Sequence, residues 1–258
     1  MADGDGDIFV YLGGEQRVPR HVVHAVIDPS VKIVRAGAFA YRRQLVSVVF
    51  HDGVGIIEHD AFRECESLRR LKKLVGVREI GDRAFQNCVA LRVTEFGDNL
   101  ETVGDSSFFG CDFLSRIKMP TARNIQDWAF GRCYRLTGAE FGVNLERIGF
   151  KAFGDCPNLY SISIPLKYDL FPFDRNINYQ RRNQFDDCRN LRVVDIVGAE
   201  DIHKTISSFH MESWKDEMNV EIDRIDLYHC PIKANRIHNG FDQSSIKWTT
   251  TNLSTVDI

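Results

Sequence analysis

The sequence predicts an α/β solenoid built from repeated helix–strand units, and three observations predict it. Seven Phe residues recur along the chain, with successive gaps of 23, 23, 23, 22, 23 and 32 residues. Six of them are followed three residues later by Cys, and all seven are followed six residues later by Leu. A period near 23 residues is typical of stacked repeats that bury their apolar faces against each other. The recurring residues are Phe39, Phe62, Phe85, Phe108, Phe130, Phe153 and Phe185.

Residues 77–96 (VREIGDRAFQNCVALRVTEF) predict the order of elements within one repeat. Phe85 and Cys88 lie three residues apart, which predicts one to two turns of helix. So short a helix is stable only when it is packed against neighbours. Leu91 and Phe96 then mark a bend followed by a strand whose residues alternate between two sides. Each repeat is therefore expected to contribute one short helix and one strand.

The repeat divides the chain into three parts. Residues 1–30 are expected to form an N-terminal cap and a half-repeat, because the strand pattern extends backward from the first Phe. Residues 31–198 are expected to hold seven repeats, with an insertion at about 165–184. Residues 199–258 lose the period and are expected to form a cap that covers the open end of the solenoid, followed by a polar tail.

The C-terminal cap has its own pattern. Residues 201–220 carry apolar side chains at roughly helical spacing, and residues 220–227 alternate as a last strand would. Residues 240–258 are rich in Ser and Thr and only weakly patterned, so we expect them to fray.

Composition and charge exclude several classes of function. The 258 residues are 43% hydrophobic and 27% charged, and the formal net charge of −3 gives no electrostatic argument for nucleic acid or an anionic membrane. No run of about 18 apolar residues occurs, so no transmembrane helix is expected. The N-terminus MADGDGD lacks the basic and apolar regions of a secretory signal. We therefore expect a cytoplasmic or otherwise intracellular protein, and a monomer.

Six of the seven cysteines keep the period of the repeat. In a reducing compartment they would be small buried apolar groups. A disulfide framework is the alternative, although equivalent positions in neighbouring repeats are expected to lie too far apart for it. Cys230 is the one cysteine outside the repeat and the one we expect to be most reactive.

The repeats resemble a known family. The segments IIEHDAFRECESL (56–68), EIGDRAFQNCVAL (79–91) and RIGFKAFGDCPNL (147–159) are similar to the I-G-x-x-A-F-x-x-C-x-x-L signature of the BspA-like leucine-rich repeat. The resemblance covers roughly residues 22–197. It implies a right-handed leucine-rich-repeat solenoid, with a parallel sheet on the concave side and short helices on the convex side. It also implies protein binding or cell-surface adhesion, with no catalytic residues and no cofactor.

The outward positions of the expected strands form two rows along the sheet. One row reads Lys72, Glu95, Lys118 and Glu140, so its charge alternates. This alternation predicts either a charged docking surface or a salt ladder that keeps the strands in register. In the other row, Arg70 and Arg116 have no acidic neighbour, so we expect them to meet an acidic group of a partner.

The insertion near 165–184 combines aromatic residues with arginines. This composition is typical of interaction hot spots, and insertions in solenoids often project as binding loops. The alternative is that the aromatic side chains fold back and cover the next repeat. The candidate partner-binding residues are therefore Arg70, Lys72, Glu95, Arg116, Lys118, Tyr168, Phe171, Phe173, Arg175, Tyr179, Arg181 and Arg182.

The sequence contains no complete motif for a metal, a cofactor or catalysis. His21 and His24 lie in a strand region and face opposite sides, which makes a poor metal pair. Asp3, Asp5 and Asp7 imitate the start of a calcium loop that the following residues do not complete. No phosphate-binding glycine loop or nucleophile motif occurs. The sequence therefore favours a non-enzymatic interaction scaffold, and the alternative is a surface or adhesion module that lacks its leader in this chain.

Overall fold

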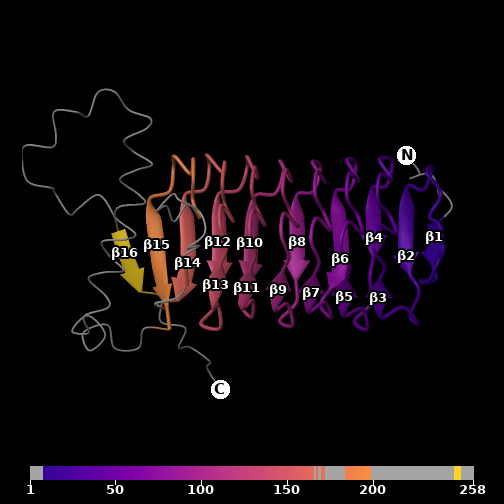
Figure 1. Cartoon of the computed structure of the whole chain (residues 1–258), viewed down its shortest axis with the longest axis horizontal. Coiled ribbons are helices and arrows are strands. Elements are labelled where there is room, and N and C mark those ends of the chain that lie inside the picture. The colour runs from indigo at the N-terminus through magenta and orange to yellow at the C-terminus, as the bar shows by residue number, and fades with distance from the viewer. Residues whose placement is uncertain (1–7, 166, 168–169, 172–183, 199–246, 251–258) are drawn as a thin grey trace, which may run out of the picture.

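The computed structural model describes residues 8–165, 167, 170–171, 184–198 and 247–250. Within these residues the chain winds into successive coils that stack along one axis, with the first strand at one end and the last two at the other (Figure 1). Every strand pairing is parallel, as expected for a chain that returns to the same edge once in each coil. The solenoid that the Phe spacing predicts is confirmed.

Each coil carries a strand of a long main row. These strands form two five-stranded sheets, β1-β2-β4-β6-β8 and β10-β12-β14-β15-β16. Their bounds are β1 Ile8–Tyr11, β2 His24–Ile27, β4 Ser47–Val49, β6 Arg70–Leu74, β8 Val93–Phe96, β10 Arg116–Met119, β12 Gly138–Phe141, β14 Ser161–Pro165, β15 Val193–Val197 and β16 Lys247–Thr250.

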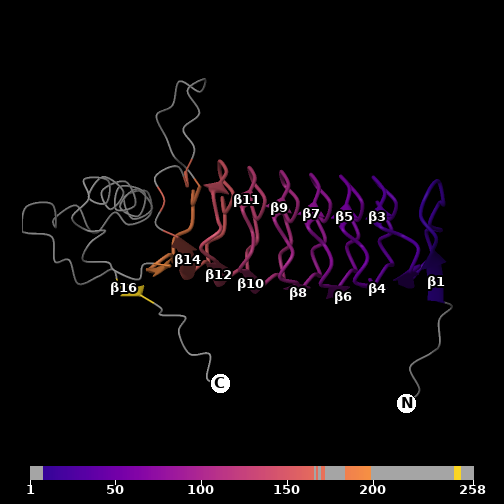
Figure 2. The ribbon, with the colours of Figure 1, turned by 90° about the horizontal axis from the view of Figure 1, so that it is seen from below.

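A second sheet of two-residue strands lies on another side of the coils, and the view from below separates it from the main row (Figure 2). Its order is β13-β11-β9-β7-β5-β3, so it also follows the coils one by one. The bounds are β3 Ile33–Val34, β5 Ile56–Ile57, β7 Glu79–Ile80, β9 Thr102–Val103, β11 Asn124–Ile125 and β13 Arg147–Ile148.

The short helices predicted around each Phe are wrong, because the described residues contain no helix. In one repeat, the N–H of Phe85 donates to the carbonyl of Ser107 in the next coil at 2.7 Å, whereas the N–H of Gln86 turns back to Arg83 at 3.1 Å. Consecutive donors thus alternate between the neighbouring coil and a local turn. Positive φ angles of 55° at Arg83 and 58° at Asn87 produce this alternation, and an α-helix has no such angles.

The recurring Phe residues form a buried column through the stack. Successive rings lie 4.8 to 5.6 Å apart between centroids and nearly parallel, as Phe62 and Phe85 do at 5.1 Å and 1°. Tyr11 of β1 continues the column at its N-terminal end, 5.1 Å from Phe39. Rings that approach the column edge-on come from Phe50, Phe96, Phe141 and Phe171.

The cysteines of the repeats are free, buried thiols that each donate to a backbone carbonyl of the preceding coil. The Cys65 thiol donates to the carbonyl of Phe39 at 3.0 Å, and the same contact recurs at the other five. Burial raises the pKa of Cys65 from 9.0 to about 12. Arg42 stands at the Cys position of the first full repeat, and its side chain donates to the carbonyl of Val18 at 2.7 Å. The first repeat therefore keeps a side-chain donor to a backbone carbonyl at this position, although the thiol is replaced by a guanidinium.

Two details of the main row differ from the expected pattern. The repeat puts Lys73 at the position equivalent to Phe96, five residues after the repeat Leu. In β6, however, the register with β8 shifts between Leu71 and Leu74, so Leu74 pairs with Phe96 and is buried. An irregularity of this kind lets one extra residue fit without displacing the core positions that follow. The Thr-rich tail, expected to fray, contributes β16, which pairs with β15. The helix expected over 201–220 and the strand expected over 220–227 lie outside the described residues.

Candidate interaction surfaces

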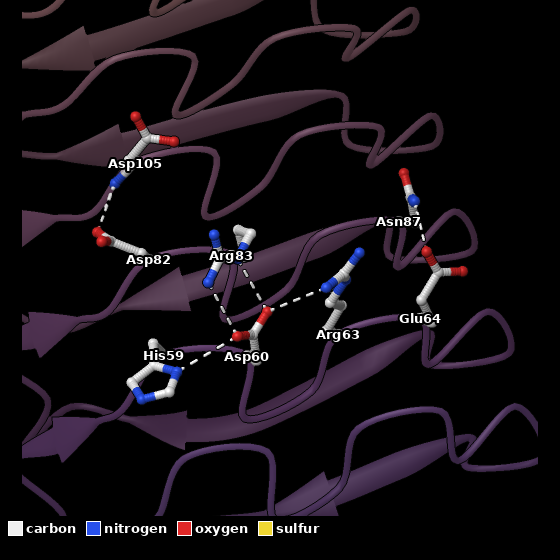
Figure 3. Close-up of polar contacts among 8 residues, drawn as sticks. All are labelled: His59, Asp60, Arg63, Glu64, Asp82, Arg83, Asn87 and Asp105. Carbon is white, nitrogen blue, oxygen red and sulfur yellow. Dashed lines mark hydrogen bonds and ion pairs between the residues drawn. The ribbon is translucent and has the colours of Figure 1, made fainter.

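The turns around the Phe column carry charged side chains that pair from coil to coil (Figure 3). Arg83 makes a two-pronged contact with Asp60 of the preceding coil, from Nε to Oδ1 at 3.0 Å and from Nη2 to Oδ2 at 3.1 Å. Arg63 lies 3.6 Å from the same carboxylate, and His59 lies 3.3 Å from it. The hydrogen bonds from Arg83 lower the pKa of Asp60, so this carboxylate stays charged to lower pH.

The same kind of contact recurs between neighbouring coils, at several turns of the coil, with the period of the sequence. Four further pairs join residues exactly one repeat apart in number: Arg35–Glu58, Arg43–Glu66, Arg123–Glu146 and Arg132–Asp155. Backbone donors are paired in the same way, since the N–H of Asp105 donates to Oδ1 of Asp82 at 2.9 Å. These contacts, together called the paired edge below, join charged side chains of one coil to those of the next and help to hold neighbouring repeats in phase.

The outer face of the main row behaves differently. Arg70 and Lys72 on β6 and Arg116 and Lys118 on β10 are all exposed, as the alternation predicts. Lys118 lies opposite Glu140 in the register of β10 and β12, but no ion pair joins these two described side chains. The salt ladder considered for this row is therefore not formed there. The side chain of Glu95 lies outside the described part of the structure.

Next to this face, arginines from two coils lie against one aromatic ring. The guanidinium of Arg135 lies 3.9 Å from the ring centroid of Phe113, and that of Arg92 lies 5.1 Å from it. The three residues come from consecutive coils, with Phe113 in the middle one. Burial raises the pKa of the neighbouring Asp112, while the charge of Arg135 opposes this rise. The recurring residue types do not mark this cluster: Phe113 and Arg135 occupy equivalent positions one repeat apart, but the residue type at that position changes from repeat to repeat.

The insertion is only partly described. Phe171 is 6% exposed and packs edge-on against Phe185 at 6.0 Å between centroids. This placement agrees with the alternative in which the aromatic side chains cover the next repeat, and it leaves Phe171 unavailable to a partner. The other candidates of the insertion lie outside the described residues: Tyr168, Phe173, Arg175, Tyr179, Arg181 and Arg182.

The described residues offer little for other kinds of site. No group of three or more His, Cys, Asp or Glu side chains among them is placed to hold a metal ion. Nor does this part of the chain contain a helix of the length and apolar character needed to cross a membrane.

The solenoid has counterparts among solved structures. A leucine rich repeat protein of T. pallidum (TpLRR) is 21% identical with a TM-score of 0.50, over 83% of this chain and 90% of that one. One from Bacteroides ovatus ATCC 8483 is 24% identical over 69% of this chain and 56% of that one, with a TM-score of 0.45. A leucine rich cell surface protein from Faecalibacterium prausnitzii A2-165 is 21% identical over 76% and 68%, with a TM-score of 0.41. No curated protein matches.

At these identities, the likeness to the T. pallidum protein supports the fold alone. The family is shown by a family model described as the BspA type leucine rich repeat region, which matches six copies over residues 32–160 and 98–213. These ranges cover more than half of the sequence and contain most of the Phe column and both kinds of strand. The chain therefore belongs to the BspA type leucine rich repeat family.

Proposed function

We propose that the protein is a non-enzymatic scaffold that binds another protein through the outer face of its main strand row. The observation that carries the proposal is the contrast between the two charged regions. Asp60 and Arg83 of the paired edge are used within the fold, whereas Arg70 and Arg116 are exposed and form no ion pair with a described residue. Flat rows of side chains on stacked repeats are well suited to binding extended partners.

The insertion provides a second surface that a partner could use. Its arginines and aromatic residues have the composition of a hot spot, and residues 172–183 can be exchanged without touching the buried Phe171. We therefore propose a test that treats the face and the insertion separately. One variant carries Arg70→Glu and Arg116→Glu, and a second replaces residues 172–183 by a Gly-Ser linker of equal length.

The experiment is a cross-linked pull-down from the source cells, with recovered proteins quantified by mass spectrometry. A partner that binds the face is lost with the Arg70→Glu/Arg116→Glu variant and kept with the linker variant. The opposite result assigns binding to the insertion. A matched control carries Arg17→Glu and Arg20→Glu, which reverse two exposed charges away from the main row. If no protein is recovered more strongly than with an unrelated solenoid, the scaffold function is wrong.

For the location, we propose an intracellular, monomeric protein, as the sequence analysis expects. The alternative is a surface or adhesion module, which agrees with the cell-surface description of the F. prausnitzii protein. Surface biotinylation of intact cells separates the two, because only an exposed protein is labelled before lysis. Labelling of the intact cells would replace the intracellular assignment by the surface one.

A further inference from the structure

We infer that the outer face between β6 and β12 binds an extended acidic segment of a partner protein. The inference rests on the proposed function, since it names the chemistry of the partner that the face would take. The surface concerned, called the basic surface below, consists of Arg69, Arg70, Lys72, Arg92, Arg116, Lys118 and Arg135.

The basic surface concentrates positive charge in a protein whose formal net charge is −3. All seven side chains are exposed, and none of them forms an ion pair with another described residue. The acidic residues beside them are fewer: Asp112, whose pKa is raised by burial, Glu140, and Glu95 of β8, whose side chain lies outside the described part of the structure. An unpaired cluster of this kind raises the local concentration of anionic partners and speeds their association.

Two of the guanidinium groups are held in place before any partner binds. Arg92 and Arg135 lie against the ring of Phe113, at 5.1 and 3.9 Å from its centroid. A cation–π contact uses the face of the guanidinium and leaves its N–H donors free for carboxylates. Because side chains that are already ordered lose less entropy on binding, this arrangement favours a tight contact with an anion.

The spacing of the surface fits a polypeptide. Arg70 and Arg116 begin β6 and β10, and β8 lies between them. β8 pairs with β6 and lies against β10 where the two five-stranded sheets meet. At the usual strand spacing these two steps amount to about 9.6 Å, and an extended chain advances about 10 Å over three residues. Lys72 and Lys118 repeat the same separation two residues further along these strands. We consider an extended segment that runs across the strands and carries Asp or Glu at every third residue. Its successive acidic side chains would lie as far apart as the basic side chains of β6 and β10, and could therefore contact them in turn.

A single-stranded nucleic acid fits the surface less well. Such ligands stack their bases on aromatic rings, and here guanidinium groups from both neighbouring coils lie against the ring of Phe113. The net negative charge of the whole chain also opposes a polyphosphate more strongly than a short acidic peptide.

The test measures binding of a fluorescein-labelled peptide, Glu-Gly-Ser repeated five times, to the full chain by fluorescence anisotropy at low salt. The triple variant Arg70→Glu/Arg92→Glu/Arg116→Glu is expected to weaken binding by about tenfold or more, because three attractive contacts become repulsive. The matched control Arg17→Glu/Arg20→Glu/Lys32→Glu changes the net charge equally at exposed sites off the main row and is expected to weaken binding by about twofold or less.

Three outcomes would overturn the inference. Equal losses in the two triple variants would mean that only net charge matters. Tighter binding of a fifteen-residue oligothymidylate than of the peptide would assign the surface to nucleic acid. Absence of binding by any anionic probe would remove the acidic partner altogether. If reversal disturbs folding, as circular dichroism would show, the neutral variant Arg70→Gln/Arg92→Gln/Arg116→Gln supplies the same comparison.

The inference and the proposed function can fail separately. If a partner is recovered from cells and the triple variant binds it equally well, the scaffold function is supported and the inference of an acidic segment is wrong. If the peptide binds but no partner is recovered from cells, the basic surface does bind acidic segments and the proposed scaffold function is wrong.

Discussion

The paired edge and the basic surface carry the same kinds of side chain and use them differently. On the paired edge, Arg83 contacts Asp60 of the preceding coil, and comparable pairs recur one repeat apart along the stack. On the basic surface, Arg70 and Arg116 occupy equivalent strand positions with β8 between them, and neither has an ionic partner among the described residues.

The difference teaches that position in the coil decides what a charge does in this fold. Turn residues of successive coils face each other, so complementary side chains there strengthen the stacking that holds the solenoid together. Strand residues on the outer face point away from the core, so their charges remain available to a partner. Changes at the edge should therefore alter stability, and changes on the face should alter binding.

The largest effect is expected from the column that supports both regions. Phe85→Ala removes a fully buried ring that stacks at 5.1 Å on each neighbour, and we expect the free energy of unfolding to fall by about 3–5 kcal/mol. Urea denaturation followed by circular dichroism measures the change. Tyr134→Ala, at an exposed aromatic residue, is the control and is expected to shift stability by about 0.5 kcal/mol or less. Equal effects of the two substitutions would show that the Phe column does not contribute more to stability than an exposed aromatic residue does.

An intermediate effect is expected at alkaline pH. Burial raises the pKa of Cys65 from 9.0 to about 12, so the folded state holds this proton longer than the unfolded state does. The stability that depends on the neutral thiol is present below pH 9 and is lost as the pH rises toward 12. Cys65→Ser keeps a donor for the Phe39 carbonyl but does not ionise, so its stability should fall less steeply over this range. Parallel pH profiles of the two proteins would disprove this account.

The smallest effect on the free energy of unfolding is expected from a comparison of one substitution on the paired edge with one on the basic surface. Asp60→Asn breaks a partly exposed ion pair, and we expect it to lower the free energy of unfolding by about 1 kcal/mol at neutral pH. Because the pKa of Asp60 is lowered in the folded state, the difference from the parent protein should disappear as the pH falls through that pKa. Arg116→Gln is the matched control on the face and should change stability by about 0.5 kcal/mol or less. If Arg116→Gln costs as much as Asp60→Asn, the division between edge and face is wrong.

Sequence reasoning could predict the stack because its signals repeat. The Phe period placed the column, and the alternation along the strands correctly placed Arg70, Lys72, Arg116 and Lys118 on the outside. The spacing between Asp60 and Arg83 equals one repeat and could have predicted the paired edge, although complementary charges at that distance matter only once a solenoid is assumed.

Other features depend on conformations that residue types mark only in part. Phe85 and Cys88 are three residues apart in a helix and also in the observed turns, and only the positive φ angles of Arg83 and Asn87 separate the two. Arginine has no preference for that conformation, but Asn87 and its equivalents Gly110, Asp155 and Asp187 are of residue types that favour it, so the sequence carries a weak signal for these turns. The contact of Arg92 and Arg135 with Phe113 uses positions whose residue type changes from repeat to repeat, so a search for recurring residue types does not find it.

The buried thiols give each coil a chemical reporter of its own. A thiol that is closed to solvent reacts with an alkylating reagent only when its surroundings open, so the rate at each cysteine measures opening of one coil. With a Cys in six of the seven Phe repeats, peptide mapping of the labelled protein would read local stability along the stack in a single experiment. Repeating the measurement with a bound partner would show in which coils the partner slows alkylation and in which coils the rate stays unchanged.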